Sequence, residues 1–276
     1  MKKIVLTGAA GALGHQLRAP LAAMAEQLVS TDLADTVEGL AGNETYVKAD
    51  LGDGAAVMDL LDGAEMVVHF GAIGDEAPFE EILHSNFLGA YNVWNAAQKH
   101  GVRRIVYASS IHAMGMYPKT TRIDTKMPHR PDTFYGLSKC FAEDMASMYW
   151  DKYGIEAVCL RIYSASGPVG NARALGSWLS YDDLIQLVQR SIDTPITGFT
   201  VVYGVSNNDR SPVDNSAASF LGYRPKDNAE DFAEAILAQT PQAEPQDKAQ
   251  MCHGGPFATV PLGESGVAYI KKMSVS

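Results

Sequence analysis

The stretch that decides the fold is Ile4-Val5-Leu6-Thr7-Gly8-Ala9-Ala10-Gly11-Ala12-Leu13-Gly14. Its first residues form a short apolar run rich in β-branched side chains, which predicts a buried strand. It continues into three glycines, Gly8, Gly11 and Gly14, whose spacing predicts a tight turn that opens a helix and brings backbone amides close to a pyrophosphate. The amino-terminal end of that helix offers unpaired N–H groups and a positive dipole end to the phosphates. The stretch therefore predicts the first strand, turn and helix of a dinucleotide-binding fold.

An acidic residue after the second predicted strand indicates which dinucleotide binds. The run Gln27-Leu28-Val29-Ser30-Thr31 predicts that strand, and Asp32 follows it, 18 residues after Gly14. A carboxylate here accepts hydrogen bonds from the hydroxyls of the adenosine ribose, and it repels the 2′-phosphate of NADP. Leu33 follows where an arginine would favour NADP. Without the glycine turn, Asp32 would be interpreted as a turn residue at a strand end. With it, we expect NAD as the cofactor.

Strands and helices alternate along the first 162 residues and predict an α/β protein. Further strands are predicted at 45–49, 66–70, 104–108 and 156–162, and helices at 54–61, at 78–100 and around Tyr135. Right-handed crossovers between them give a Rossmann-like, doubly wound parallel sheet that the strand at 156–162 closes. We expect residues 1–162 to be the NAD-binding core. Residues 163–276 then form a small C-terminal substrate-binding extension, integral with the core as one structural unit.

Ligands of such sheets bind at the carboxyl ends of the strands, so the loops there are candidate cofactor contacts. Asp50 is predicted either to flank the adenine or to cap the helix that begins at Gly54. Small residues at Gly71 and Ala72 let the backbone approach the cofactor. The residues that we expect to contact NAD are Gly8, Ala10, Gly11, Ala12, Leu13, Gly14, Asp32, Leu33, Asp50, Leu51, Phe70, Gly71, Ala72, Tyr135, Lys139 and Ile162.

A tyrosine and a lysine in the segment 133–139 are candidates for catalysis. Tyr135 and Lys139 are four residues apart and share one face of a helix. A phenol has a pKa of ~10, and a nearby ammonium favours the phenolate, which makes Tyr135 a candidate general acid/base. Ser110 follows the strand at 104–108 and can hold the same substrate oxygen. Each feature also has a purely structural explanation. Tyrosine and lysine four residues apart are common on helices, and serines often satisfy backbone groups at strand ends. Together with the glycine turn, they predict an oxidoreductase.

These motifs resemble the short-chain dehydrogenase/reductase superfamily, in its extended branch with epimerases and dehydratases. The resemblance covers roughly the first 165 residues. Three further segments, at 109–118, 135–141 and 220–230, are similar to the bacterial uronate dehydrogenases, and this second resemblance extends almost to the C-terminus. It implies an enzyme that oxidises the anomeric carbon of glucuronate or galacturonate with NAD to an aldarolactone.

The resemblance also implies roles for single residues. Tyr135 would take the proton of the anomeric hydroxyl while C1 passes hydride to the nicotinamide. Lys139 would lower the pKa of Tyr135 and bind the ribose, and Ser110 would position the O1 atom. The substrate carboxylate would be bound by Arg173, whose guanidinium can form two parallel hydrogen bonds with it. The expected substrate-binding residues are Ser110, Ile111, His112, Tyr135, Ser164 and Arg173.

Three departures from the family pattern leave the sugar open. Ile111 stands where the family has asparagine, Gly74-Asp75 where it has serine, and the segment 210–213 replaces a tryptophan-rich turn. The alternatives are an NAD-dependent dehydrogenase of a neutral or phosphorylated sugar and a nucleotide-sugar epimerase or dehydratase. Only about 115 residues follow the strand at 156–162, and they contain no basic cluster for a pyrophosphate. This favours the dehydrogenase.

Composition excludes several other classes of protein. The formal net charge of −10 argues against a nucleic-acid partner. No apolar run approaches the ~20 residues of a membrane span, and the first residues lead into a strand, so we expect a cytoplasmic protein. The three cysteines show no metal-ligand spacing, and we expect free thiols and no metal. The poorly periodic segment 240–245 is compatible either with a mobile tail or with docking on another subunit in a homo-oligomer.

Overall fold

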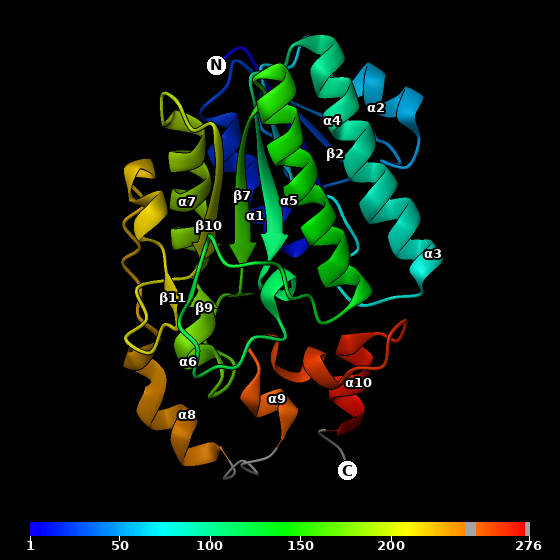
Figure 1. Ribbon diagram of the computed structural model, residues 1–276. Coiled ribbons are helices and arrows are strands. Elements are labelled where there is room, and N and C mark those ends of the chain that lie inside the picture. Colours follow the sequence, from blue (N-terminus) through cyan, green and yellow to red (C-terminus); the bar gives the residue numbers. More distant parts are fainter. Residues whose placement is uncertain (241–246, 274–276) are drawn as a thin grey trace.

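A seven-stranded parallel sheet forms the centre of the molecule (Figure 1). The computed structural model describes residues 1–240 and 247–273. The strands are β1 (Lys3–Thr7), β2 (Gln27–Asp32), β3 (Glu44–Lys48), β4 (Met66–His69), β5 (Arg104–Ser110), β7 (Glu156–Ile162) and β10 (Phe199–Gly204). Their order is β10-β7-β5-β4-β1-β2-β3, so the sheet grows in opposite directions from β1. This confirms the doubly wound fold and places the switch point between β1 and β4, where such folds bind dinucleotides.

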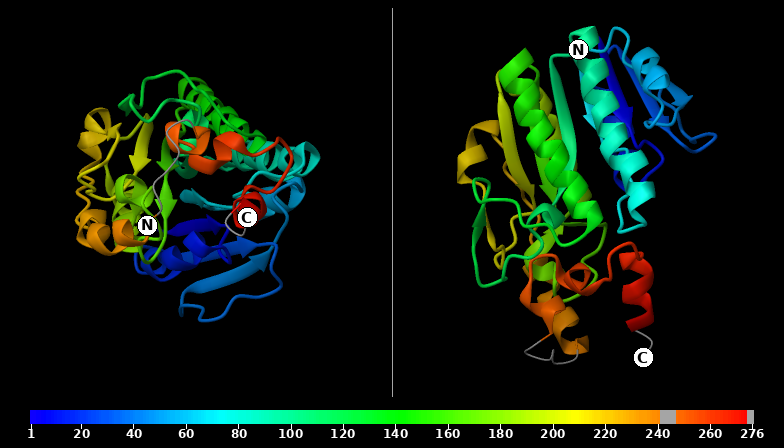
Figure 2. Two further views of the ribbon diagram at one scale, coloured as in Figure 1. Left: turned by 90° about the horizontal axis from the view of Figure 1, so that it is seen from below. Right: turned by 45° about the vertical axis from the view of Figure 1, so that its right-hand side comes forward.

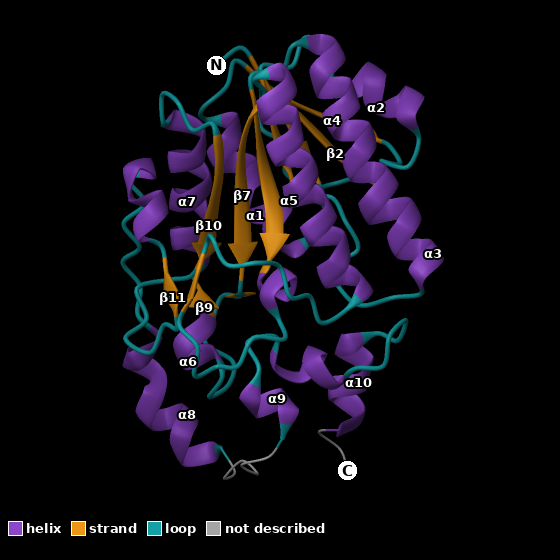
Figure 3. Ribbon diagram, viewed as in Figure 1, coloured by secondary structure: helices purple, strands orange, loops and turns teal. Residues whose placement is uncertain are grey.

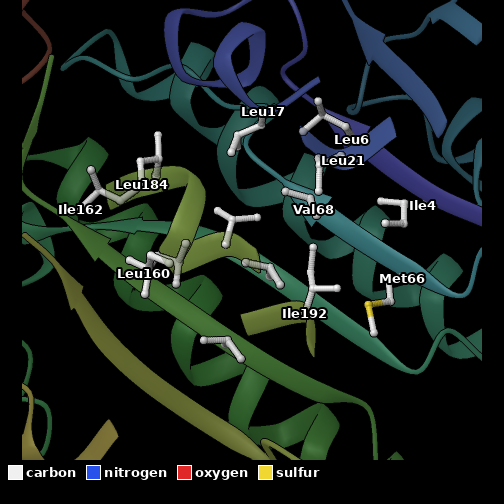
Figure 4. Packing of buried hydrophobic residues seen from close by; sticks show 14 of the residues in the cluster. Ile4, Leu6, Leu17, Leu21, Met66, Val68, Leu160, Ile162, Leu184 and Ile192 are labelled. Carbon is white, nitrogen blue, oxygen red and sulfur yellow. The ribbon is translucent and has the colours of Figure 1, made fainter. Parts of the chain in front are cut away.

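Helices cover both faces of the sheet (Figure 3). One face carries α1 (Ala12–Ala22) and α7 (Tyr181–Asp193), and the other carries α2 (Gly54–Leu60), α4 (Gly89–His100) and α5 (Phe134–Tyr153). Figure 4 shows the first interface, where leucines of α1 and α7 pack on buried aliphatic side chains of the strands. The sequences of the strands are nearly continuous apolar runs, because both faces of the parallel sheet are buried under helices.

The helix predicted at 78–100 is interrupted. It consists of α3 (Phe79–Ile82), a π-helical turn η1 (Leu83–Leu88) and α4, which ends at His100 and is followed by Gly101 in the left-handed region. Within η1 the buried amide of Asn86 accepts a 2.9 Å hydrogen bond from Ile73 N and donates one of 3.1 Å to Ser138 Oγ. A π turn inserts one residue into the helical repeat. Here it accompanies an inward amide that links the loop after β4 to α5.

The prediction that the strand at 156–162 closes the sheet is wrong. β10 lies beyond it and pairs in parallel with β7, from Phe199 opposite Ala157 to Gly204 opposite Ile162. The helix before it, α7, begins after Ser180, whose Oγ accepts a hydrogen bond from Asp183 N. Residues 163–276 thus complete the sheet and cover one face in addition to forming the extension. The assignment of substrate binding to this segment stays a prediction.

Most of the remaining small elements gather beyond the carboxyl ends of the strands, as the right view in Figure 2 shows, whereas η3 packs beside α7. They are η2 (Ile111–Met114), β6 (Ile123–Asp124), β8 (Ser164–Ala165), α6 (Ala174–Ser177), β9 (Trp178–Leu179), β11 (Val213–Asp214), η3 (Ser216–Leu221), η4 (Ala229–Phe232), α8 (Ala233–Gln239), α9 (Lys248–Met251), η5 (Gly255–Thr259) and α10 (Gly266–Met273). Among these elements, η4 continues directly into α8. Over the described ranges, no helix has the length and apolar character needed to cross a membrane.

Candidate active site

The glycine turn between β1 and α1 is shaped for close backbone approach. Gly8 has a φ of +76°, and a Cβ there would lie 2.6 Å from Gly71 N. A Cβ on Gly14 would lie 1.9 Å from the carbonyl oxygen of Gly8, so α1 can begin against the turn only without a side chain at this position. The N-cap residue of α1 is Gly11, and no side chain caps the helix. The first amides of α1 therefore remain available to an anion.

Two adjoining cavities of about 350 and 450 Å³ lie along this end of the sheet. Their walls contain every residue that the sequence predicts to contact NAD, and both cavities include Gly8, Gly11, Phe70 and Ala72. The first runs from the glycine turn past Asp32 and Asp50. The second extends from the turn to Tyr135 and Lys139. This arrangement has room for an extended dinucleotide, with the adenosine at one end and the nicotinamide beside Tyr135.

The two acidic residues of the first cavity have different surroundings. Asp32 accepts hydrogen bonds from Ala10 N at 2.9 Å and from Leu33 N at 2.7 Å, which fix its carboxylate beside the glycine turn. Asp50 does not cap α2, because Asp53 does so by accepting from Ala55 N. A hydrogen bond from His84 is the main cause that lowers the pKa of Asp50. Of the two roles predicted for Asp50, the helix cap is excluded.

Tyr135 sits at the start of α5 and is fixed by its backbone. Thr133 Oγ1 caps the helix by accepting from Gly136 N at 2.9 Å. The amide of Tyr135 donates a 2.8 Å hydrogen bond to Glu76 Oε2 from the loop after β4. Sequence reasoning missed Glu76, although a carboxylate at a helix N-terminus is a common arrangement. The backbone of Tyr135, from which the phenol extends, is thus held in place by the loop after β4.

The titration of the Tyr135 and Lys139 pair differs from the sequence prediction. Burial raises the pKa of Tyr135 to about 12, although a hydrogen bond with Ser110 acts in the opposite direction. Burial also lowers the pKa of Lys139 to about 7. The expectation that Lys139 brings the pKa of Tyr135 towards neutrality is therefore wrong for the protein alone. The lysine Nζ atom donates to Ala108 O at 2.8 Å, and burial weakens its charged form.

A third cavity of about 1070 Å³ adjoins the second on the side of the C-terminal elements. His112 and Tyr163 line both, so they stand where the two spaces meet. The predicted substrate residues Ile111, Ser164 and Arg173 line the third cavity. The predicted substrate residues thus line two adjoining cavities, with Ser110 and Tyr135 on the second, Ile111, Ser164 and Arg173 on the third, and His112 on both.

Arg173 is a half-buried cation without an acidic partner among the described residues. Its Nη1 atom donates to Ser164 Oγ at 3.0 Å and its Nη2 atom to His253 O at 3.0 Å. The buried Nε atom has no hydrogen-bond partner, and within residues 1–240 and 247–273 no carboxylate pairs with the guanidinium. Burial lowers the pKa of Arg173. Because an uncompensated buried charge is costly, this arrangement is typical of a site that receives an anion.

The two departures closest to this cavity have clear structural roles. Ile111 lines the third cavity. Its apolar side chain is only 2% exposed because it packs in a core with Met114 and Ile123. Asp75 does not present a free carboxylate to the sugar. It accepts hydrogen bonds from Ser265 Oγ at 2.6 Å and Gly266 N at 2.9 Å and thereby caps α10.

Sequence reasoning missed a buried ionic cluster beneath Ser110. Glu143 of α5 accepts hydrogen bonds from Ser109, His129 and Arg161. Burial alone would raise the pKa of Glu143, but these partners lower it to about 2. The i+4 spacing of Lys139 and Glu143 on one helix was the available signal. The cluster fixes the end of β5, which carries Ser110, to α5, which carries Tyr135.

Comparison with known proteins points to one family. Residues 4–181 match the model of the NAD dependent epimerase/dehydratase family. The chain is 46% identical over 256 residues to a uronate dehydrogenase of Pseudomonas putida, with 93% of this chain and 95% of the relative covered. It is 44% identical over 262 residues to that of Agrobacterium fabrum, with 95% and 98% covered. A crystal structure of uronate dehydrogenase from Agrobacterium tumefaciens, a tyrosine-to-alanine variant complexed with NAD, superimposes with a TM-score of 0.91 at 44% identity, covering 95% of this chain and 98% of that one.

Proposed function

The chain belongs to the NAD dependent epimerase/dehydratase family, and we propose that it oxidises the anomeric C1 hydroxyl of a hexuronate, glucuronate or galacturonate, to an aldarolactone with NAD. The half-buried side chain of Arg173 carries this proposal, because it lines the cavity next to Tyr135, its buried Nε atom has no hydrogen-bond partner, and no carboxylate of the described residues pairs with it. A neutral sugar would leave that charge uncompensated. The similarity to uronate dehydrogenases over nearly the whole chain supports the same substrate class.

The chain's own residues divide the chemistry between them. When bound, NAD supplies the acceptor for the hydride that leaves C1. Tyr135 accepts the proton of the C1 hydroxyl, and Ser110 holds the O1 atom against the tyrosine. Lys139 binds the coenzyme ribose and provides a positive charge next to the phenol. The oxidised carbon becomes the carbonyl of the lactone, since the ring oxygen remains attached to C1.

Arg173 and Ser164 orient the sugar by its carboxylate. The guanidinium already uses Ser164 Oγ and a backbone carbonyl to fix two of its nitrogens. A carboxylate bound here satisfies the Nε atom and neutralises the charge. With the carboxylate fixed at one side of the ring, C1 is directed towards Tyr135. We therefore assign NAD binding to residues 1–162 and sugar binding mainly to residues 163–276.

NADH formation tests the proposal directly. The purified protein is incubated with NAD and, in separate reactions, glucuronate, galacturonate, glucose, glucose 6-phosphate and a UDP-sugar, and absorbance of NADH is followed. We expect NADH with the uronates. NADH formation with only a neutral or phosphorylated sugar would show that this sugar, and not a uronate, is the substrate. No NADH with any free sugar would refute the proposal that the protein is a sugar dehydrogenase. In Tyr135→Phe, turnover is expected to be lost while NAD binding persists.

An exposed apolar stripe on η1, α4 and α5 supports a homo-oligomer. Its members are more than a third exposed although they lie on neighbouring helices: Leu83, Leu88, Tyr91, Leu137, Phe141 and Met148. A second copy placed with its own stripe against this one would cover both, as a two-fold interface does. Light scattering should give twice the mass of the chain, and Tyr91→Glu/Met148→Glu should give the monomer. A monomeric wild-type protein would refute this arrangement.

A cytoplasmic location completes the proposal. All three cysteines are free thiols, as proteins of reducing compartments usually have. Fractionation of the producing cell, with activity assayed in each fraction, tests the location.

A further inference from the structure

We propose that Asp132 is a positioning residue that sets the tautomer of His112, so that His112 presents an acceptor nitrogen to a sugar hydroxyl. The proposal rests on the proposed function, because it assigns His112 a neutral hydroxyl of the sugar as its partner. Neither residue belongs to the Tyr135, Lys139 and Ser110 set, and no sequence motif singles out Asp132.

Asp132 is enclosed where three segments of the chain meet. Its side chain has no exposed surface. Its Oδ1 atom accepts a 3.0 Å hydrogen bond from Thr133 Oγ1, at the start of α5. Its Oδ2 atom lies so near the backbones of Gly115 and Gly254 that a Cβ at either glycine would come within 1.9 Å of it. These neighbours leave the carboxylate one orientation.

The Oδ2 atom of this fixed carboxylate lies 2.8 Å from His112 Nδ1. A carboxylate only accepts hydrogen bonds, so Nδ1 must carry the proton. In a neutral imidazole the lone pair then lies on Nε2, which has no hydrogen-bond partner among the described residues. The ring cannot turn freely, because it lies between Phe257, with 4.3 Å between ring centres, and Tyr135, at 5.7 Å.

His112 lines both the cavity that contains Tyr135 and the larger one that contains Arg173. A sugar held by its carboxylate at Arg173 and by C1 at Tyr135 passes this ring. An acceptor at Nε2 receives the proton of a sugar hydroxyl, and the oxygen of that hydroxyl stays free to accept from other donors. Asp132 therefore favours a polyhydroxylated ring in one orientation without touching it.

Steady-state kinetics with NAD and glucuronate test this inference in Asp132→Asn. The amide nitrogen of asparagine can donate to Nδ1 and so moves the imidazole proton to Nε2. We expect KM for glucuronate to rise about tenfold, the effect of one mismatched hydrogen bond, with kcat and the Kd for NAD changed less than about twofold. The control is Asp124→Asn, in the same segment between β5 and α5. The Asp124 carboxylate accepts hydrogen bonds from Lys126 N at 2.8 Å and from Met127 N at 3.0 Å. This control should match the wild type.

A double variant separates positioning from a general loss of structure. If Asp132 acts through His112, then Asp132→Asn should have no further effect in a His112→Ala background. A residue that only stabilises the fold would lower kcat/KM equally in both backgrounds, and that outcome would overturn the proposal. An equal rise in KM in the Asp124→Asn control would overturn it as well.

Nitrogen-15 NMR of histidine-labelled protein reads the tautomer without any substrate. The His112 signal is identified by its absence in His112→Ala. We expect a protonated Nδ1 in the wild type and a protonated Nε2 in Asp132→Asn. A wild-type ring protonated at Nε2, or at both nitrogens, would refute the inference. Because this measurement needs no turnover, it distinguishes a wrong role for Asp132 from a wrong substrate for the enzyme.

Discussion

The Nζ atom of Lys139 donates a 2.8 Å hydrogen bond to the carbonyl oxygen of Ala108 and lies 5.3 Å from the centre of the Tyr135 ring. The ammonium is therefore near the phenol but held by the end of β5. Burial disfavours the charged form of both groups, which raises the pKa of Tyr135 to about 12 and lowers that of Lys139 to about 7. Between about pH 7 and pH 12 the most populated form is therefore a neutral phenol beside a neutral amine. The form that can take a proton from the substrate is a phenolate beside an ammonium. The two forms contain the same number of protons.

This proton balance predicts the pH profile. If oxidation needs both the phenolate and the ammonium, kcat/KM should rise tenfold per pH unit up to about pH 7 and then stay level. Above pH 7 each gain in phenolate is offset by a loss of ammonium. In Lys139→Met the level region should disappear, and the rate should keep rising to pH 10. A wild-type profile that rises with unit slope beyond pH 8.5 would show that the ammonium is not required.

Arg173 should decide between a uronate and a neutral sugar. Arg173→Met removes the charge, and we expect kcat/KM for glucuronate to fall about 100-fold, as loss of a charge-assisted pair implies. The activity with glucose, however low, should not fall. The matched control is Arg173→Lys, which keeps the charge but loses the fork of donors and should give an intermediate value. An equal loss for both sugars would indicate that Arg173 supports the fold instead.

The fold was predictable because its signals are local. The glycine turn, the apolar strands and Asp32 are each contained in a few adjacent residues, and the structure places them as expected. The position of β10 was not, because a short apolar run does not reveal which strand it pairs with. The π turn at Asn86 also left no mark in the spacing of apolar residues. Both depend on contacts between distant segments.

The candidate site was predictable only where one residue type carries the chemistry. Tyr135, Lys139 and Arg173 have such side chains, and they line connected cavities. Residues that act through partners were missed, since Asp132 and Glu76 receive their roles from contacts with His112 and with the amide of Tyr135. The pKa values could not be inferred, because burial outweighs the spacing of charges along the helix.

Asp75 should hold α10 in place. It accepts hydrogen bonds from Ser265 Oγ and from two amides at the start of α10. Asp75→Asn removes the charge that favours this helix end, at a cost of about 1 kcal/mol. Amide hydrogen exchange at 266–269 should accelerate about fivefold, while α2 stays protected. In the control Asp53→Asn, which removes the corresponding charge at α2, the pattern should be reversed. Unchanged amide exchange in α10 would show that Asp75 does not hold this helix in place.

Glu143 should stabilise the protein in a pH-dependent manner. Its pKa is about 2 in the folded protein and near 4.5 in an unfolded chain. A lowered pKa contributes stability that is complete above pH 4.5 and is lost as pH falls towards 2. In Glu143→Gln, which leaves Arg161 unpaired, the free energy of unfolding in urea should drop by about 3 kcal/mol at pH 7. The difference from wild type should shrink at pH 3. A constant difference between pH 7 and 3 would contradict this assignment.

Asp32 should exclude NADP, and its neighbour should make that preference easy to invert. The carboxylate is fixed by Ala10 N and Leu33 N, and the side chain of Leu33 is exposed at the same cavity. A 2′-phosphate there would meet a negative charge, and no lysine or arginine is among the described residues that line this cavity. In Asp32→Ala/Leu33→Arg the repulsion is removed and a guanidinium is added, so kcat/KM with NADP should rise at least tenfold and that with NAD should fall. The control is Asp35→Ala, a carboxylate of the same loop that instead pairs with Lys48, and it should keep the wild-type preference. If the double variant still rejects NADP, the ribose lies elsewhere in the cavity, and the assignment of Asp32 to its hydroxyls is wrong.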